Sequence, residues 1–175
     1  SVDSQSNNSL KYFNGSSWQT SGGAGGGGTV YATGPQTAMT ITNSYTDLTG
    51  ASASLTLAAG KCARVTYWTS NAGSVPKHIA LVVGATSWQV MSTASASSLF
   101  QGQILLCNSA AVQNAQASIA TLHGTAGTAA ITPRTKTDWA EDLSTSKTVK
   151  LQAKCDTSCS DTVQVSAFTV EKLEN

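Results

Sequence analysis

Short strand-like runs, separated by turn residues, make up the chain from Thr29 onward, and no stretch has the periodicity of a helix of three turns. In the runs ASASLTL at 51–57 and TVKLQA at 148–153, every second residue is apolar. Alternation with a period of two is typical of a strand that buries one face and wets the other. The sequence therefore predicts an all-β fold, either a sandwich or a barrel.

Other runs are apolar on both faces, so one sheet alone does not cover them. HIALVV at 78–83 and ILLC at 104–107 have no polar face, and in the last strand Val163 and Val165 alternate in one direction while Phe168 and Val170 point in the other. We interpret Phe168 and Val170 as an interface between three copies of the chain, which would bury the second face. The alternative is a β-bulge near Ala167 that resets the register.

Composition limits the domain count and the class of partner. With 175 residues, of which 40% are hydrophobic, the chain suffices for one globular domain. Ten Lys and Arg oppose nine Asp and Glu, and 11% charged residues give no basic stripe for nucleic acid. No apolar run approaches the roughly 20 residues that span a bilayer, so we expect no membrane insertion. The opening SVDSQSNNS lacks the features of a signal peptide, so we expect any export signal to lie upstream, in a longer protein.

Four cysteines allow three pairings, and their spacing favours one. Cys155 and Cys159 bracket a short turn, whereas Cys62 and Cys107 lie on separate strand-like runs. We predict the disulfides Cys155–Cys159 and Cys62–Cys107, and with them an oxidising compartment. A metal site at C-x3-C and free thiols in a reducing compartment are the alternatives; the spacing suits zinc poorly, so we expect no metal.

The first 28 residues differ from the rest. LKYFNGSSWQT at 10–20 contains an Asn-Gly pair suited to a tight hairpin turn, and SGGAGGGG at 21–28 interrupts any regular element. We predict a neck of residues 1–28, with a hairpin and a Gly-rich hinge, followed by one domain of residues 29–175.

Two stretches resemble known families. LKYFNGSSWQT resembles a short motif of tail fibres of phages and of trimeric adhesive fibres of predatory bacteria, where it forms a hairpin just before the tip. YTDLTG at 45–50, SLTLAAGKCARVTYW at 54–68 and DTVQVSAFTVEKL at 161–173 are similar to heads of the C1q and tumour-necrosis-factor type. The resemblance implies a jelly-roll sandwich that forms a homotrimer. The four cysteines and the insertion at 121–146 depart from the family, so no binding residue is carried over.

Motifs of catalysis are absent from the sequence. There is no H-E-x-x-H, G-x-S-x-G or G-x-x-x-x-G-K, and the two histidines, His78 and His123, lie beside an apolar strand and in a Gly-rich turn. Paired carboxylates, Asp138 with Glu141 or Glu141 with Asp142, would suit a glycosidase if they lay about 5 to 9 Å apart. Solvated loop charges explain them more simply, so we expect no enzyme and no cofactor.

Aromatic residues in loops indicate binding instead. Trp139 lies near carboxylates in the long loop, a combination that suits sugars, and Trp68 and Trp88 end strand-like runs where rim loops start. Lys77 stands at a loop end beside a proline. The predicted ligand-binding residues are Trp139, Asp138, Glu141, Trp68, Trp88 and Lys77.

Together these features predict a non-enzymatic adhesive or receptor-binding head at a cell or virion surface, whose ligand is a glycan or another component of the cell envelope. A structural virion decoration or fibre-end cap is the second hypothesis, and a wall-polymer hydrolase the third. The sequence leaves open which ligand is bound and whether the source is a phage or a bacterium.

Overall fold

The computed structural model describes residues 28–92, 98–108 and 141–173, together with the backbone of residues 11–13, 18–20 and 115–125. The regular structure in these residues consists of β-strands without a helix, as the alternating pattern predicts. Near the N-terminus, β1 (Lys11–Phe13) and β2 (Trp18–Thr20) pair antiparallel, with Phe13 opposite Trp18. Trp139, Asp138 and His123's side chain lie outside the described residues.

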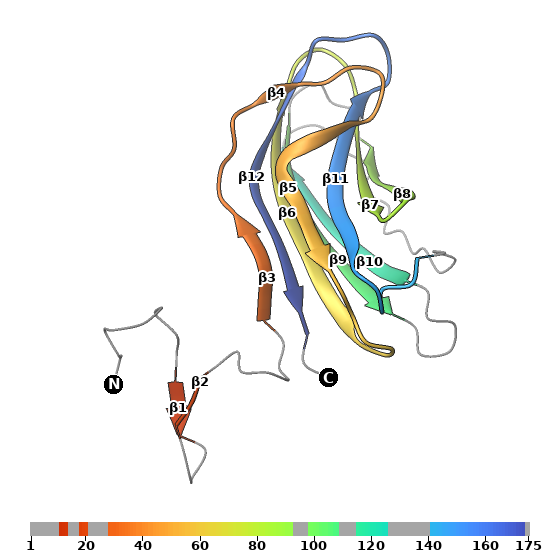
Figure 1. The fold of residues 1–175 in the computed structure, drawn as a ribbon. Helices are drawn as coiled ribbons and strands as arrows, with labels where there is room; N and C mark the ends of the chain where they lie inside the picture. Colours follow the sequence, from red (N-terminus) through yellow and green to blue (C-terminus); the bar gives the residue numbers. More distant parts are fainter. Residues whose placement is uncertain are drawn as a thin grey trace.

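Two antiparallel sheets face each other in a sandwich (Figure 1). The larger sheet has the order β10 (Ala115–Thr125), β9 (Ser98–Asn108), β6 (Cys62–Ala72), β12 (Thr162–Lys172) and β3 (Gly28–Thr33). β4 (Met39–Thr40) pairs with β12 on the same edge as β3. The smaller sheet has the order β5 (Thr46–Leu55), β11 (Lys147–Cys155), β7 (Lys77–Val83) and β8 (Thr86–Ser92).

The core between the sheets consists of the inward-facing residues of both. Along 51–57 and 148–153, each apolar residue is buried and each polar neighbour is exposed or half-buried, as predicted. β7 is also buried on its second face, where Ala80 and Val82 lie opposite Gln152 and Lys150 of β11. The aliphatic parts of these long polar side chains are suited to lie over small apolar neighbours.

A β-bulge in β12 places Phe168 and Val170 inside the chain, where they were not predicted to lie. The register of β12 against β6 shifts between Val165 and Ala167, so the strand changes which parity faces the core. Phe168 and Val170 are therefore fully buried within one chain, and the Phe168 ring lies 5.9 Å from that of Tyr31. The assignment of these two residues to a subunit interface is wrong, because the chain itself already covers them.

Both predicted disulfides are present. Cys62–Cys107 joins directly opposite positions of β6 and β9, and Cys155–Cys159 joins the end of β11 to the loop that follows it. Two bridges fit an oxidising compartment. Within the described ranges, no helix is long and apolar enough to cross a membrane.

Candidate functional site

The sandwich has two ends, and the strand register identifies them. β12 ends at Lys172, which pairs with Gly28 at the start of β3, and begins at Thr162, which pairs with Ala72 and Thr40. The 11 residues of β12 separate these ends by roughly 33 Å. We call the end near Thr162 the distal end, because it lies opposite the entry of the chain from its N-terminal segment (Figure 1).

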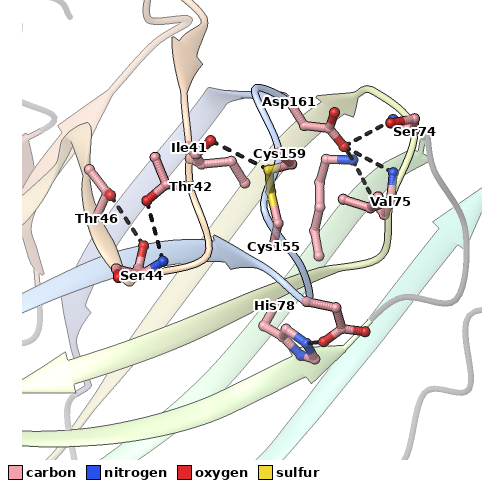
Figure 2. The surroundings of a disulfide bond; sticks show 12 residues. Ile41, Thr42, Ser44, Thr46, Ser74, Val75, His78, Cys155, Cys159 and Asp161 are labelled. Atoms are coloured by element: carbon pink, nitrogen blue, oxygen red, sulfur yellow. Dashed lines mark hydrogen bonds and ion pairs between the residues drawn. A yellow bond between two sulfur atoms is a disulfide. The ribbon is translucent and has the colours of Figure 1, made fainter.

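Three loops meet at the distal end: residues 41–45, 73–76 and 156–161. Together with Lys77, which pairs with Asp161, they form what we call the distal cluster. Figure 2 shows residues of all three loops around the Cys155–Cys159 bridge. The loops meet because each connects strands that cross between the sheets or end at this edge: β4 to β5, β6 to β7 and β11 to β12.

A buried ion pair lies at the centre of the distal cluster. Lys77 Nζ is 2.9 Å from Asp161 Oδ2, and the two side chains are 1% and 7% exposed. Asp161 Oδ2 also accepts hydrogen bonds from the backbone amides of Ser74 and Val75, while Lys77 donates to the Val75 carbonyl. Buried charges require this kind of pairing and hydrogen bonding.

The protonation of Asp161 follows from these contacts. Desolvation alone would raise the pKa of Asp161, but the hydrogen bonds from Lys77, Val75 and Ser74 and the charge of Lys77 outweigh it and lower the pKa. Asp161 is therefore a carboxylate at neutral pH, and its negative charge anchors the 73–76 loop through two amides.

Gly73 makes the close approach of that loop possible. Its φ is 135°, a conformation that side chains disfavour, and a Cβ there would overlap the Asp161 carboxylate. The sequence Ala-Gly-Ser-Val at 72–75 thus folds its backbone directly onto the acid.

The disulfide and backbone hydrogen bonds connect the other two loops. The Cys155 amide donates to the Thr42 carbonyl at 2.8 Å, and the Asp156 amide donates to the Pro76 carbonyl at 3.1 Å. Cys159 Sγ lies 3.5 Å from the Ile41 carbonyl. The bridge at 155–159 therefore lies between the 41–45 loop and the 73–76 loop and keeps all three in one arrangement (Figure 2).

Small polar side chains cover the surface of the distal cluster. Its exposed residues with hydroxyl, amide or carboxylate groups are Thr42, Asn43, Ser44, Ser74, Asp156, Thr157, Ser158 and Ser160. The charged groups at its margin are already engaged: Asp156 with His78, and Lys154 over the Tyr45 ring at 5.0 Å. This surface can donate and accept many hydrogen bonds to an uncharged ligand.

Cys155, Cys159 and Asp161 also place three potential metal-ligand atoms within 4.8 Å of one another. In this structure the two sulfurs are joined in a disulfide, and a disulfide sulfur is not the thiolate that zinc binds. This arrangement therefore serves as a covalent bridge rather than a zinc site.

Most predicted ligand-binding residues that the structure describes do not line a common surface. Lys77 and Trp88 are buried, Lys77 as the cation of the ion pair. Glu141 is also buried, and it accepts hydrogen bonds from the Ala85 amide and the Thr86 hydroxyl at the turn between β7 and β8. The prediction of surface roles for these three residues is wrong, because each side chain has an internal partner or lies in the core.

Among the predicted binding residues that the structure describes, Trp68 is exposed, and it lies on a surface other than the distal cluster. It lies on the outer face of the larger sheet with 51% of its area exposed, and Leu99 on β9 is 58% exposed. Because Trp68 faces Gln101 and Ser70 faces Leu99, Trp68 and Leu99 are diagonal neighbours on one face. We call Trp68, Leu99 and Ala167, which lies opposite Trp68, the outer patch.

Asp161 and Gly73 were not predicted as site residues. Asp161 stands just before an alternating strand, and an acidic residue at such a place is normally interpreted from sequence as a solvated loop charge. The spacing of Gly73 and Asp161 in sequence gives no signal that they meet. Comparisons with known proteins add no further candidate: no family model, no curated protein and no solved structure matches this chain.

Proposed function

We propose that this chain is the non-enzymatic head of an extracellular, homotrimeric fibre, which uses its distal cluster to bind a glycan or another component of a cell envelope. The observation that carries the proposal is the distal cluster itself: a cross-linked, hydroxyl-rich surface at the end of the sandwich opposite Gly28. A ligand surface of this kind loses little conformational entropy on binding, because its loops are already fixed.

The strand connectivity supports the jelly-roll part of the proposal. From β5 to β12 the chain alternates between the sheets, apart from the hairpins β7–β8 and β9–β10. Strands far apart in sequence become neighbours, β5 with β11 and β6 with β12. Crossing connections that bring early and late strands together are what a jelly roll of the C1q and tumour-necrosis-factor type requires.

The outer patch supports the trimeric part. Trp68 and Leu99 are large, exposed apolar side chains on a sheet face that also carries the Arg64–Glu171 ion pair and the half-buried Leu105, and exposed apolar groups of this size mark contact surfaces. We propose that the copies contact one another through the outer patch, and not through Phe168 and Val170, which are buried within each chain. Trimerisation would also present three ligand surfaces on one tip, and the resulting avidity exceeds the affinity of each.

Light scattering tests the assembly. We expect a trimeric mass for the native chain at micromolar concentration and a monomeric mass for Trp68→Glu, because a charge would be buried without a partner in an apolar contact. Ser52→Glu, on the exposed face of β5, is the matched control and should remain trimeric. A monomeric native chain contradicts the trimer; a trimeric Trp68→Glu variant contradicts the outer patch as its interface.

Binding to a glycan array and to whole cell envelopes tests the function. Ser158→Arg places a long side chain on the exposed 156–161 loop and should abolish binding, whereas Ser54→Arg on the outer face of β5 should not. Equal binding of both variants would remove the distal cluster as the ligand surface.

The structural cap remains the second candidate, and the outer patch is the observation that favours it. A cap needs self-association and no ligand, so a trimer that binds no envelope component would support it. The hydrolase has less support, because Glu141, the carboxylate shared by both candidate pairs, is engaged with Ala85, Thr86 and Lys147.

A further inference from the structure

The inward face of β6 changes character halfway along the strand. In the half near Gly28, Ala63 and Val65 are buried apolar residues of the core. In the distal half, the inward positions hold Tyr67, Thr69 and Asn71, which are 0%, 1% and 7% exposed. Three consecutive inward positions of a core strand are thus occupied by side chains with hydrogen-bonding groups.

These groups have no partner among the described residues. Six buried side-chain nitrogen and oxygen atoms of the described residues lack a hydrogen-bond partner. Four of them are Tyr67 Oη, Thr69 Oγ1, Asn71 Nδ2 and Asn71 Oδ1. The other two, on His78 and Asn108, lie on different strands. Buried polar atoms in folded proteins nearly always have a hydrogen-bond partner, and ordered water supplies it where the protein does not.

The backbone makes room for this polar stripe. Tyr67 lies opposite Gly102 of β9, and a Cβ on Gly102 would overlap the Tyr67 ring, so the ring occupies the space over that glycine. Thr69 lies opposite Phe100 and Val165 in the adjacent strands, which offer no side-chain hydrogen bond. Thr69, at the middle of the stripe, is therefore flanked by apolar side chains on both sides within its own sheet.

The chemistry of the stripe selects an uncharged guest. Burial raises the pKa of Tyr67, so its phenol is neutral at any physiological pH, and threonine and asparagine carry no charge. The nearby charges, Lys77 and Asp161, neutralise each other. Hydroxyl and amide groups donate and accept, so a matching guest must also do both.

We propose that Tyr67, Thr69 and Asn71 form an internal binding site for a neutral hydroxyl-bearing guest, either ordered water or a small polyol, which enters from the distal end. Asn71, the most exposed of the three, stands two residues before Gly73 of the distal cluster, so it is the end of the stripe nearest the distal end. This inference does not depend on the proposed function, because it concerns the interior of one chain.

A crystal structure at about 1.5 Å and native mass spectrometry test it directly. We expect density for a guest within hydrogen-bonding distance of Tyr67 Oη and the Asn71 amide. A polyol would also add a discrete mass to the native protein, whereas water would not, and either result supports the site. A dry interior, or density showing that protein groups already satisfy these atoms, overturns the proposal.

Replacing Thr69 or Asn71 by an apolar residue of similar size gives a second readout. The melting temperature should fall if a guest is bound and rise if the polar atoms are unpaired. If a guest bonds to the stripe, Thr69→Val and Asn71→Leu each remove a hydrogen bond and should lower the melting temperature by about 2–4 °C. If the atoms are truly unpaired, the same changes remove a desolvation cost and should raise it. Thr66→Val, on the outer face of the same strand, is the matched control for strand propensity.

Discussion

The ion pair in the distal cluster gives the sharpest prediction of stability. Removing one partner of a buried pair costs about 3–5 kcal/mol, because the other charge stays buried without its counter-ion. In Lys77→Met, the Asp161 carboxylate keeps two amide hydrogen bonds, so we expect a loss of about 3 kcal/mol. Asp161→Ala removes the counter-ion and the acceptor of three donors at once, so we expect about 5 kcal/mol, the upper end of that range.

The assay is urea unfolding followed by tryptophan fluorescence, at neutral pH and at pH 3. The folded pKa of Asp161 lies below its unfolded value of about 3.9, so the pair stabilises the fold above that pH and the contribution disappears as the pH falls through the folded pKa. The difference between the native chain and Asp161→Ala should therefore shrink in acid.

Lys150→Met is the matched control. Lys150 pairs with Asp47 at 2.7 Å, but Asp47 is 58% exposed, so the loss should be at most about 1 kcal/mol. Equal losses in Lys77→Met and Lys150→Met, or a smaller loss in Asp161→Ala than in Lys77→Met, would refute the view that burial and the two amides set the energetics of the cluster.

Two further predictions concern the stability contributed by the disulfides and by Gly73. Replacing both cysteines of the Cys155–Cys159 bridge by serine should cost about 2 kcal/mol by loop entropy, and replacing those of Cys62–Cys107 about 4 kcal/mol; urea unfolding of the two double variants should give this order, and the reverse order would mean that contacts rather than loop length dominate. Gly73→Ala should cost more than about 1 kcal/mol, since it combines a disfavoured φ with overlap on the buried carboxylate, and an unchanged melting temperature would show that the 73–76 loop can move away from the acid.

Much of the strand content was predictable from sequence, because alternation reports directly on one buried face. The runs at 51–57 and 148–153 and both disulfides follow from pattern and spacing alone. The end of β12 was harder: Phe168 and Val170 have the parity of an outer face, and a bulge changes that parity without leaving a mark in composition.

The candidate site was less predictable still. Lys77 and Glu141 read as surface charges, since charged residues are rarely buried unless they are paired. Their partners lie in other strands and loops, and only the fold brings them together. Trp68 and Trp88 were both expected at the ends of strand-like runs, but they lie within β6 and β8, and Trp88 faces inward while Trp68 faces outward. Sequence periodicity gives the spacing of side chains and not which sheet covers them.

If the chain is, as proposed, a head held by its N-terminal end, the placement of β3 and β4 on one edge of β12 has a mechanical consequence. A pull on Gly28, resisted at the distal cluster, acts along the strand direction, because β3 and β12 run antiparallel over that length. Such a load shears the hydrogen bonds between β3 and β12, so that they must break together. A pull across the sheet would break them one after another. The covalent path from β3 through β4 to Ile41 and Thr42 then delivers the force directly to the loops beside the Cys155–Cys159 bridge. The edge formed by β3 and β4 on β12 is thus the part of the fold that would carry a tension applied at Gly28.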